Sequence, residues 1–119
     1  MPKVKIKVRL KTEEINDSYE TAGIINRKTS TITYFEKNNT KVVFNYKNNT
    51  LTRSNNELNM EYTFDIENTT YGLIKVKELK QKLEIPIKTN KLSINDKNIK
   101  VEYIIENEKY MYYLEVKEN

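Results

Sequence analysis

The amino-acid sequence predicts an all-β protein, an antiparallel meander that closes into a barrel of about eight to ten short strands. Two observations lead to this prediction. Apolar and polar residues alternate with a period of two along most of the chain, as they do in strands that have one buried face. Asn-Asn pairs at 38–39, 48–49 and 55–56 separate these alternating stretches. Because Asn tolerates positive φ, each pair resembles the Asn-Gly of a two-residue hairpin turn.

The composition indicates one folded domain that spans residues 1–119. Hydrophobic residues make up 37% of the chain and charged residues 32%, whereas globular domains average about 45–50% and about 25%. The core is therefore expected to be thin. A net charge of only +4 and nine tyrosines, together with regular alternation, argue against a disordered chain.

Several classes of function are excluded by the residues that the chain lacks. It contains no Cys and no His, which removes thiol nucleophiles, imidazole bases and nearly all transition-metal sites. We therefore expect no metal and no cofactor. The acidic residues Glu13, Glu14 and Asp17 lie together, but solvation of a turn explains them more simply than catalysis. The prediction is a protein that is not an enzyme.

The location of the protein is predicted from its first residues and its hydropathy. The N-terminus carries no apolar leader segment, and no stretch of about 18 apolar residues occurs. We expect a cytoplasmic protein that does not bind membranes.

The first strand is the clearest. Val4, Ile6, Val8 and Leu10 occupy one face. The opposite face carries only cations: Lys3, Lys5, Lys7, Arg9 and Lys11. A turn over 14–18 leads to a strand over 19–26, where Ile24 and Ile25 are adjacent and the facing is ambiguous. Gly23 predicts a bulge or a close backbone approach.

Four strands linked by tight turns follow. Ile32, Tyr34 and Glu36 share one face of the first, and Leu51 and Arg53 share one face of the third. Between them lies a strand over 42–46, and the longest alternation runs over 58–66. Short connections of this kind predict antiparallel pairing.

The segment 71–87 gives conflicting signals. Residues 73–76 favour a strand, whereas 78–84 consists of strong helix formers, with Val76, Leu79 and Leu83 at helical spacing. We expect one long, bent strand because the surroundings are β, and we expect Pro86 to end it.

The chain closes with a hairpin. Turns at Asn95-Asp96 and Asn107-Glu108 bound strands over 99–105 and 110–116. A closed barrel is favoured over a two-sheet sandwich because it removes unpaired edges, and because sandwiches need longer crossover connections.

Four short motifs resemble a known family. They are Thr31-Ile32-Thr33-Tyr34-Phe35-Glu36, Leu51-Thr52-Arg53, Thr70-Tyr71-Gly72 and Val101-Glu102-Tyr103-Ile104-Ile105. They resemble, in order, the tyrosine-and-glutamate strand, the leucine-x-arginine strand, the tyrosine-glycine corner and the penultimate strand of the YwiB-like family of uncharacterised bacterial proteins. The resemblance spans nearly the whole chain and implies a calycin-like, lipocalin-related barrel of bacterial cytosolic origin. It implies no reaction.

The chain departs from the family pattern at two places. Ser54-Asn55-Asn56 stands where the family usually has a Gly soon after the arginine, and this replacement keeps a residue that can form a turn. Glu78 stands where the family has a Thr in the strand after the tyrosine-glycine corner.

Parity within the strands places Glu36 and Arg53 on the apolar faces. Buried charges are normally paired, so these two are expected to form an ion pair near the barrel mouth. The functional hypothesis is an anchor for an anion or polar ligand, either a small molecule or part of a protein partner. Four tyrosines would supply hydroxyls and ring faces: Tyr34, Tyr46, Tyr62 and Tyr103. The simpler alternative is a structural ion pair with tyrosines as ordinary core, since small barrels can be filled by side chains alone.

Two further hypotheses remain. The cations of the first strand could follow a nucleic-acid backbone, although no aromatic residue interleaves with them. The alternative is a solvated face that meets carboxylates on adjacent strands, for which the candidates are Glu102, Glu106 and Glu115. Outward apolar residues, Ile104, Met111 and Tyr113, suggest a structural or dimerising module.

Overall fold

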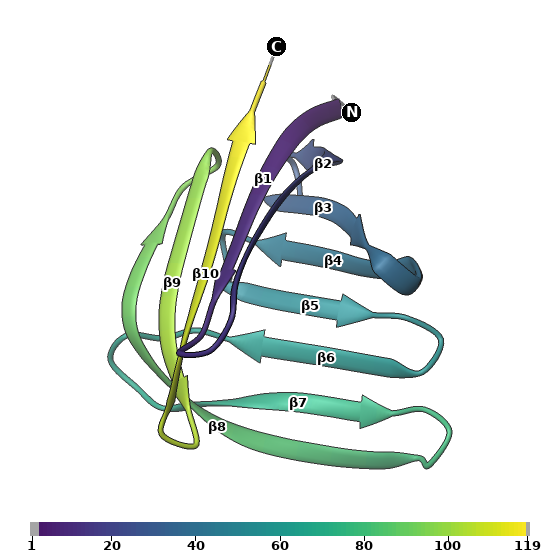
Figure 1. The fold of residues 1–119 in the computed structure, drawn as a ribbon, viewed down its shortest axis with the longest axis vertical. Coiled ribbons are helices and arrows are strands. Elements are labelled where there is room, and N and C mark those ends of the chain that lie inside the picture. Colours follow the sequence, from purple (N-terminus) through teal and green to yellow (C-terminus); the bar gives the residue numbers. More distant parts are fainter. Residues whose placement is uncertain (1–2, 119) are drawn as a thin grey trace.

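The computed structural model describes residues 3–118 and shows an antiparallel β-barrel (Figure 1). Residues 1, 2 and 119 of the expected domain lie outside the described part. The elements are β1 (Lys3–Lys11), β2 (Asn16–Asn26), β3 (Thr31–Glu36), the short 3-10 helix η1 (Lys37–Asn39), β4 (Thr40–Asn45), β5 (Thr50–Ser54), β6 (Leu58–Thr63), β7 (Thr70–Val76), β8 (Gln81–Ile94), β9 (Asn98–Ile105) and β10 (Glu108–Lys117).

Strands that follow one another in sequence are neighbours in the sheet, and the barrel closes where β1 pairs with β10. Figure 1 shows these two strands side by side, with β2 on the other side of β1. The pairing is antiparallel throughout, with Lys7 opposite Glu115 on one side and Glu20 on the other. The predicted fold class, an all-β meander that closes into a barrel, is confirmed.

The core consists of the apolar side chains that alternation directs inward. Val4, Ile6 and Val8 of β1 are buried, as are Val101 and Leu114 of the closing strands. The structure also settles the facing of the adjacent apolar pairs. Ile25 faces inward and is fully buried, whereas Ile24 is 42% exposed on the outer face. Burial selects one residue of each pair because successive side chains point to opposite faces.

The Asn-Asn pairs do lie between strands, but the expectation of two-residue turns there is wrong. Each connection is three or four residues long, and of the six Asn residues in these pairs only Asn38, Asn39 and Asn49 have positive φ. The commoner device is an Asn at a strand end or just beyond it. Asn45 Oδ1 accepts bonds from the backbone N–H groups of Lys47 and Asn48, and Asn26, Asn55 and Asn95 each do the same in their own loops.

The tight two-residue turn is at the end of the chain. Glu106 and Asn107 both have positive φ, 51° and 67°, and Ile105 pairs directly with Glu108. Such φ values are those of a type I′ turn. The turn therefore lies one residue earlier than the sequence suggested.

Residues 71–87 form two strands, not one long bent strand. β7 and β8 meet in a hairpin whose turn is Lys77–Lys80, with Lys80 at φ 50°. The sequence signal failed because Lys-Glu-Leu-Lys has no usual turn residue. Pro86 does not end β8, which continues to Ile94. The strand tolerates Pro86 because β9 pairs with β8 only from Lys88 onward. On the side of β8 that faces β9, position 86 therefore has no strand partner to which a backbone N–H would have to donate.

Gly23 marks a close approach and not a bulge. A Cβ there would lie 2.1 Å from Ile6 Cδ1 and 2.7 Å from the backbone oxygen of Thr33. The register of β2 with both its neighbours is uninterrupted at this residue. The irregularity in the sheet lies instead between Thr89 and Lys91 of β8.

Candidate ligand site at the barrel mouth

Glu36 and Arg53 meet at one end of the barrel. Glu36 is the last residue of β3 and Arg53 lies near the end of β5, with β4 between them. Arg53 Nη2 lies 3.3 Å from Glu36 Oε2, and the side chains are 25% and 20% exposed. Alternation directs both inward, since Val42, the partner of Arg53 in β4, is fully buried. The structure thus contains the ion pair that the sequence suggested.

Tyr19 joins this ion pair as a third member, which the sequence pattern did not reveal. Its hydroxyl donates to the same Glu36 Oε2 at 2.5 Å. Burial raises the pKa of Tyr19 far above its ordinary value, and Tyr34 and Glu36 raise it further, so the phenol stays a neutral donor. Alternation counted back from the buried Gly23 would have placed the Tyr19 side chain inward. The sequence left this open, because the adjacent Ile24 and Ile25 made it unclear which residues of the strand face the core.

Beneath the ion pair, Tyr34 and Tyr112 span the interior. Their hydroxyls are hydrogen-bonded at 2.8 Å, and both side chains are almost completely buried. The ring of Phe44 stacks on that of Tyr112 with centroids 5.9 Å apart. Burial raises the pKa of Tyr112 well above its ordinary value. Side chains therefore fill the barrel at this level.

A second aromatic group lies beside Arg53. Tyr103 contacts Phe64 with centroids 5.0 Å apart, meets Tyr62 edge-on at 6.2 Å, and stacks on Tyr110 at 5.3 Å and 11°. Burial raises the pKa of Tyr103 despite the opposing charge of Arg53. Tyr62 and Tyr103 thus lie together, as the site hypothesis requires. Tyr110 joins them although the sequence did not single it out.

Tyr46 does not belong to this end of the barrel. It follows β4 in the loop over 46–49, whereas Glu36 and Arg53 lie at the opposite ends of their strands. It is half-buried against the core from the other side. The structure therefore separates Tyr46 from the tyrosines at the mouth.

The guanidinium of Arg53 has few protein partners. Among residues 3–118 it donates to Glu36, while its Nε is buried and has no acceptor. Burial alone would lower the pKa of Arg53. The effects of Glu36 and the surrounding tyrosines are larger together, so the pKa of Arg53 is raised above its ordinary value. A permanently charged group with unused donors is suited to binding a carboxylate or another strong acceptor.

A cleft of about 460 Å³ opens beside Glu36. Pairing between β2 and β3 runs only from Asn26 opposite Thr31 to Gly23 opposite Tyr34, and beyond Tyr34 the two strands separate. Tyr19 and Glu36 line the cleft, together with Leu10 and the exposed Phe35. The mouth is therefore reached through the barrel wall as well as from its end.

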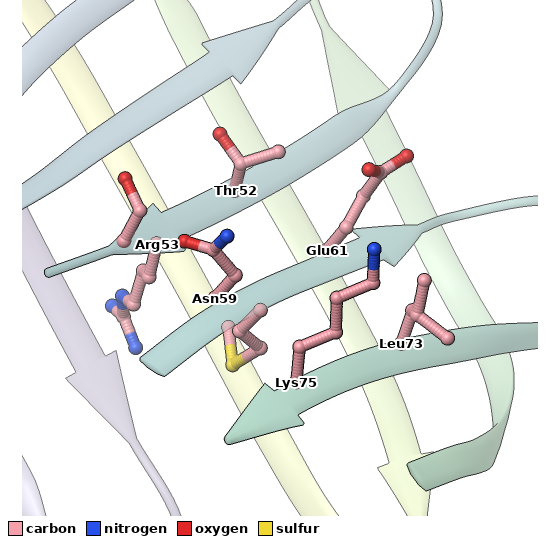
Figure 2. A pocket seen from close by; sticks show the side chains of 8 residues that line it. Thr52, Arg53, Asn59, Glu61, Leu73 and Lys75 are labelled. Carbon is pink, nitrogen blue, oxygen red and sulfur yellow. The ribbon is translucent and has the colours of Figure 1, made fainter. Parts of the chain in front are cut away.

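A second hollow lies on the outer surface of β5, β6 and β7. It measures about 250 Å³, and Thr52, Glu61 and Lys75 are among the residues that line it. Figure 2 shows these three side chains on one side of the sheet and the Arg53 side chain turned away from them. The register agrees, since Thr52 lies opposite Glu61 while Arg53 lies opposite Met60. Arg53 and Met60 also border this hollow, so it adjoins the mouth across the barrel wall.

The cations of β1 lie on the outer face, as alternation predicts. Lys5 contacts Glu20 at 4.0 Å, and Glu115 lies opposite Lys7. The other two expected carboxylates are further away. Glu102 pairs with Lys91 at 3.6 Å, and Glu106 lies in the turn between β9 and β10.

No aromatic interleaves with these cations along β1 itself, but a neighbouring strand supplies one. Tyr113 lies opposite both Arg9 on β1 and Lys100 on β9. The sequence could not show this because the neighbour comes from the other end of the chain. Tyr113 is half-buried on the outer face, as are Ile104 and Met111.

Two further observations concern the described residues alone. No group of three or more carboxylates in residues 3–118 is arranged to hold a metal ion. The same part of the chain contains no helix of the length and hydropathy needed to cross a membrane.

The fold and this site define a closed meander barrel with one polar, tyrosine-lined mouth. The YwiB protein of Bacillus subtilis, known from a crystal structure, has a similar fold. The two superpose with a TM-score of 0.68 at 13% identity, over 98% of this chain and 90% of that one. At this identity the likeness is one of fold. No protein-family model and no curated protein matches the chain.

Proposed function

We propose that this protein is a non-enzymatic binding protein whose ligand site is the mouth around Arg53. The ligand would be a small molecule with a carboxylate or similar acceptor group and an apolar or aromatic part. A protein partner could present the same chemistry on a side chain. The setting would be the cytoplasm and the barrel would be calycin-like, as the resemblance of the sequence motifs implies.

The observation that carries this proposal is the incomplete bonding of Arg53. Its side chain is three-quarters buried, yet among the described residues it donates only to Glu36. Buried donors normally have acceptors, and a donor without one costs free energy. A ligand carboxylate would supply the acceptor, and the resulting hydrogen bond would be charge-assisted.

The surroundings fit the rest of such a ligand. Tyr110 is partly exposed and stacks on the buried ring of Tyr103, so it offers an aromatic surface, and Met60, Ile74 and Ile105 pack at the edge of the core as partly buried apolar side chains. An apolar lining with a few convergent polar groups is typical of small-molecule sites. Tyr19 donates to the Glu36 carboxylate at the mouth, but burial raises the pKa of Tyr19 and keeps it a neutral phenol, which favours binding over nucleophilic chemistry.

The test is titration with an anionic aromatic probe, anilinonaphthalene sulfonate, followed by the fluorescence of the dye. Arg53→Met should weaken binding by about tenfold to a hundredfold, the usual worth of a hydrogen bond to a charged group. Arg9→Met is the matched control, because Arg9 is exposed on the outer face, and it should leave binding unchanged. Equal behaviour of the two variants, or no binding by the native protein, would contradict the proposal.

A second candidate function is nucleic-acid binding by the outer face of β1 and its neighbours. We call this surface the basic wall; its cations are Lys3, Lys5, Lys7, Arg9, Lys11, Lys88, Lys91, Lys100, Lys109 and Lys117. The carboxylates that the register places on it are Glu20, Glu102 and Glu115. The basic wall thus extends well beyond the single strand that the sequence indicated. A dense cluster of positive charges favours binding to the phosphate backbone of a nucleic acid.

The basic wall is tested by binding to a short DNA duplex and to single-stranded RNA at several salt concentrations. Affinity should fall steeply with salt, and changing Lys3, Lys5 and Lys7 together to Glu should abolish it. The control changes Lys41, Lys47 and Lys75 to Glu, which alters the net charge equally away from the basic wall. Binding that survives the first triple change would reject this function.

A further inference from the structure

The first half of β8 is an open sheet edge. Gln81–Ile87 pair with β7 on one side, while β9 pairs with β8 only from Lys88 onward. In Figure 1 this part of β8 forms the lower border of the sheet, with no strand beyond it. An edge of this kind offers unpaired backbone N–H and C=O groups to another strand.

Pro86 shows which backbone groups face outward. A proline has no N–H, so in a strand it occupies a position whose N–H does not take part in the ladder. Pro86 lies opposite Tyr71 of β7. Its N therefore faces the open side. Lys82 and Glu84 have the same parity and present their N–H and C=O groups to that side, because these directions alternate along a strand.

The side chains along this edge are complementary to themselves. In an antiparallel pair related by a two-fold axis at Leu83, Lys82 of one copy lies opposite Glu84 of the other, and the reverse holds as well. Opposite charges placed directly across two strands stabilise their pairing, whereas like charges oppose it. Lys82 and Glu84 are both exposed and have no ion-pair partner among the described residues.

Apolar side chains lie at the centre of the same edge. Leu83 is 56% exposed and Leu79 in the adjacent turn is 63% exposed. With the axis at Leu83, the two copies of this residue become neighbours on one face. Pairing would therefore cover apolar surface as well as bond the open backbone.

We propose that two copies of this chain pair antiparallel through Gln81–Ile85 of β8, with Lys82 of each opposite Glu84 of the other. The outward backbone N–H and C=O groups of Lys82 and Glu84 then bond to those of the other copy across the two-fold axis. The sheet continues from one barrel into the next, and Pro86 limits the pairing to this short segment. This surface lies away from Ile104, Met111 and Tyr113, the residues that the sequence suggested for a dimer.

The test uses two single variants and their mixture, followed by sedimentation velocity. Lys82→Glu alone opposes two carboxylates at each end of the pair, and Glu84→Lys alone opposes two ammonium groups. Each variant should be a monomer where the native protein is a dimer. An equimolar mixture should form dimers again, because the carboxylate introduced at position 82 of one variant then faces the ammonium introduced at position 84 of the other. The double variant, with both changes, should dimerise like the native protein.

Hydrogen exchange gives an independent measurement. The amides of residues 82 and 84 should exchange slowly in the native dimer and rapidly in either single variant, while those of β1 remain unchanged. A native protein that is monomeric at millimolar concentration would overturn the proposal. A native dimer that either single change leaves intact would overturn it equally, because the contact would then lie elsewhere.

Discussion

The hydroxyl groups of Tyr34 and Tyr112 are hydrogen-bonded 2.8 Å apart inside the barrel, although they come from the third and the tenth strand. Both side chains are almost fully buried, so neither hydroxyl can turn to bulk water. The bond thus closes the floor of the mouth, directly below the level at which Glu36 meets Arg53.

Removing one of these hydroxyls should destabilise the fold. Tyr112→Phe leaves the Tyr34 hydroxyl buried without its partner, and we expect a loss of about 1–3 kcal/mol in the free energy of unfolding, measured in urea. The double change of Tyr34 and Tyr112 to Phe should cost less than the sum of the single changes. Additive costs would mean that the two hydroxyls do not interact.

Alkaline pH should destabilise the protein through its buried tyrosines. Burial raises the folded-state pKa of Tyr19, Tyr34, Tyr103 and Tyr112 above the unfolded value of about 10. The resulting stability is complete below about pH 10 and is lost as the pH rises further, because the unfolded chain releases these protons first. Urea midpoints measured from neutral to strongly alkaline pH should fall only above this value.

The phenolate absorbance gives the control for this prediction. These four tyrosines should ionise only together with the loss of β-sheet circular dichroism. Ionisation of all nine tyrosines while the sheet signal is intact would contradict the assigned burial.

Gly72 should be intolerant of any side chain. A Cβ at this position would lie 2.6 Å from the ring of Tyr62, so Gly72→Val should cost about 1–3 kcal/mol through overpacking. The cost should shrink when Tyr62 is also changed to Ala, which removes the ring. Ala22→Val on the outer face is the matched control and should be nearly neutral in the same urea measurement.

Lys80→Gly should stabilise the protein. Lys80 has φ 50°, and a left-handed backbone conformation costs a residue with a side chain about 1 kcal/mol that glycine avoids. Lys77→Gly in the same turn is the control, because Lys77 does not have positive φ, and it should be neutral or destabilising. A loss of stability in Lys80→Gly would argue against the hairpin turn at Lys77–Lys80.

The sequence predicted what depends on alternation alone. Parity within β3 and β5 brought Glu36 and Arg53 to one face, and the ion pair followed from the cost of burying either charge alone. Parity could not identify Tyr19, because its inward facing depends on the register of β2 with β1, which adjacent Ile24 and Ile25 concealed. Tyr113 became a neighbour of Arg9 only through the closure of the barrel.

Turns were the weaker part of the prediction for a different reason. Lys77–Lys80 consists of residues that favour helices, and the tertiary pairing of β7 with β8 overrides that preference. The prediction that Pro86 ends the strand was wrong because a proline ends a strand only when neighbouring strands pair with it on both sides. Local propensity contains no information about either circumstance.

The pairing of β1 with β10 also determines when this chain can fold. Every other pair joins neighbours in sequence, so these hairpins can form one after another as the polypeptide leaves the ribosome. The last pair joins residues more than a hundred positions apart, such as Lys5 and Lys117. The edge of β1 that faces β10 must therefore stay unpaired until β10 has been synthesised. Contacts of such long sequence separation slow folding, so closure of the barrel is expected to follow the formation of the other strand pairs.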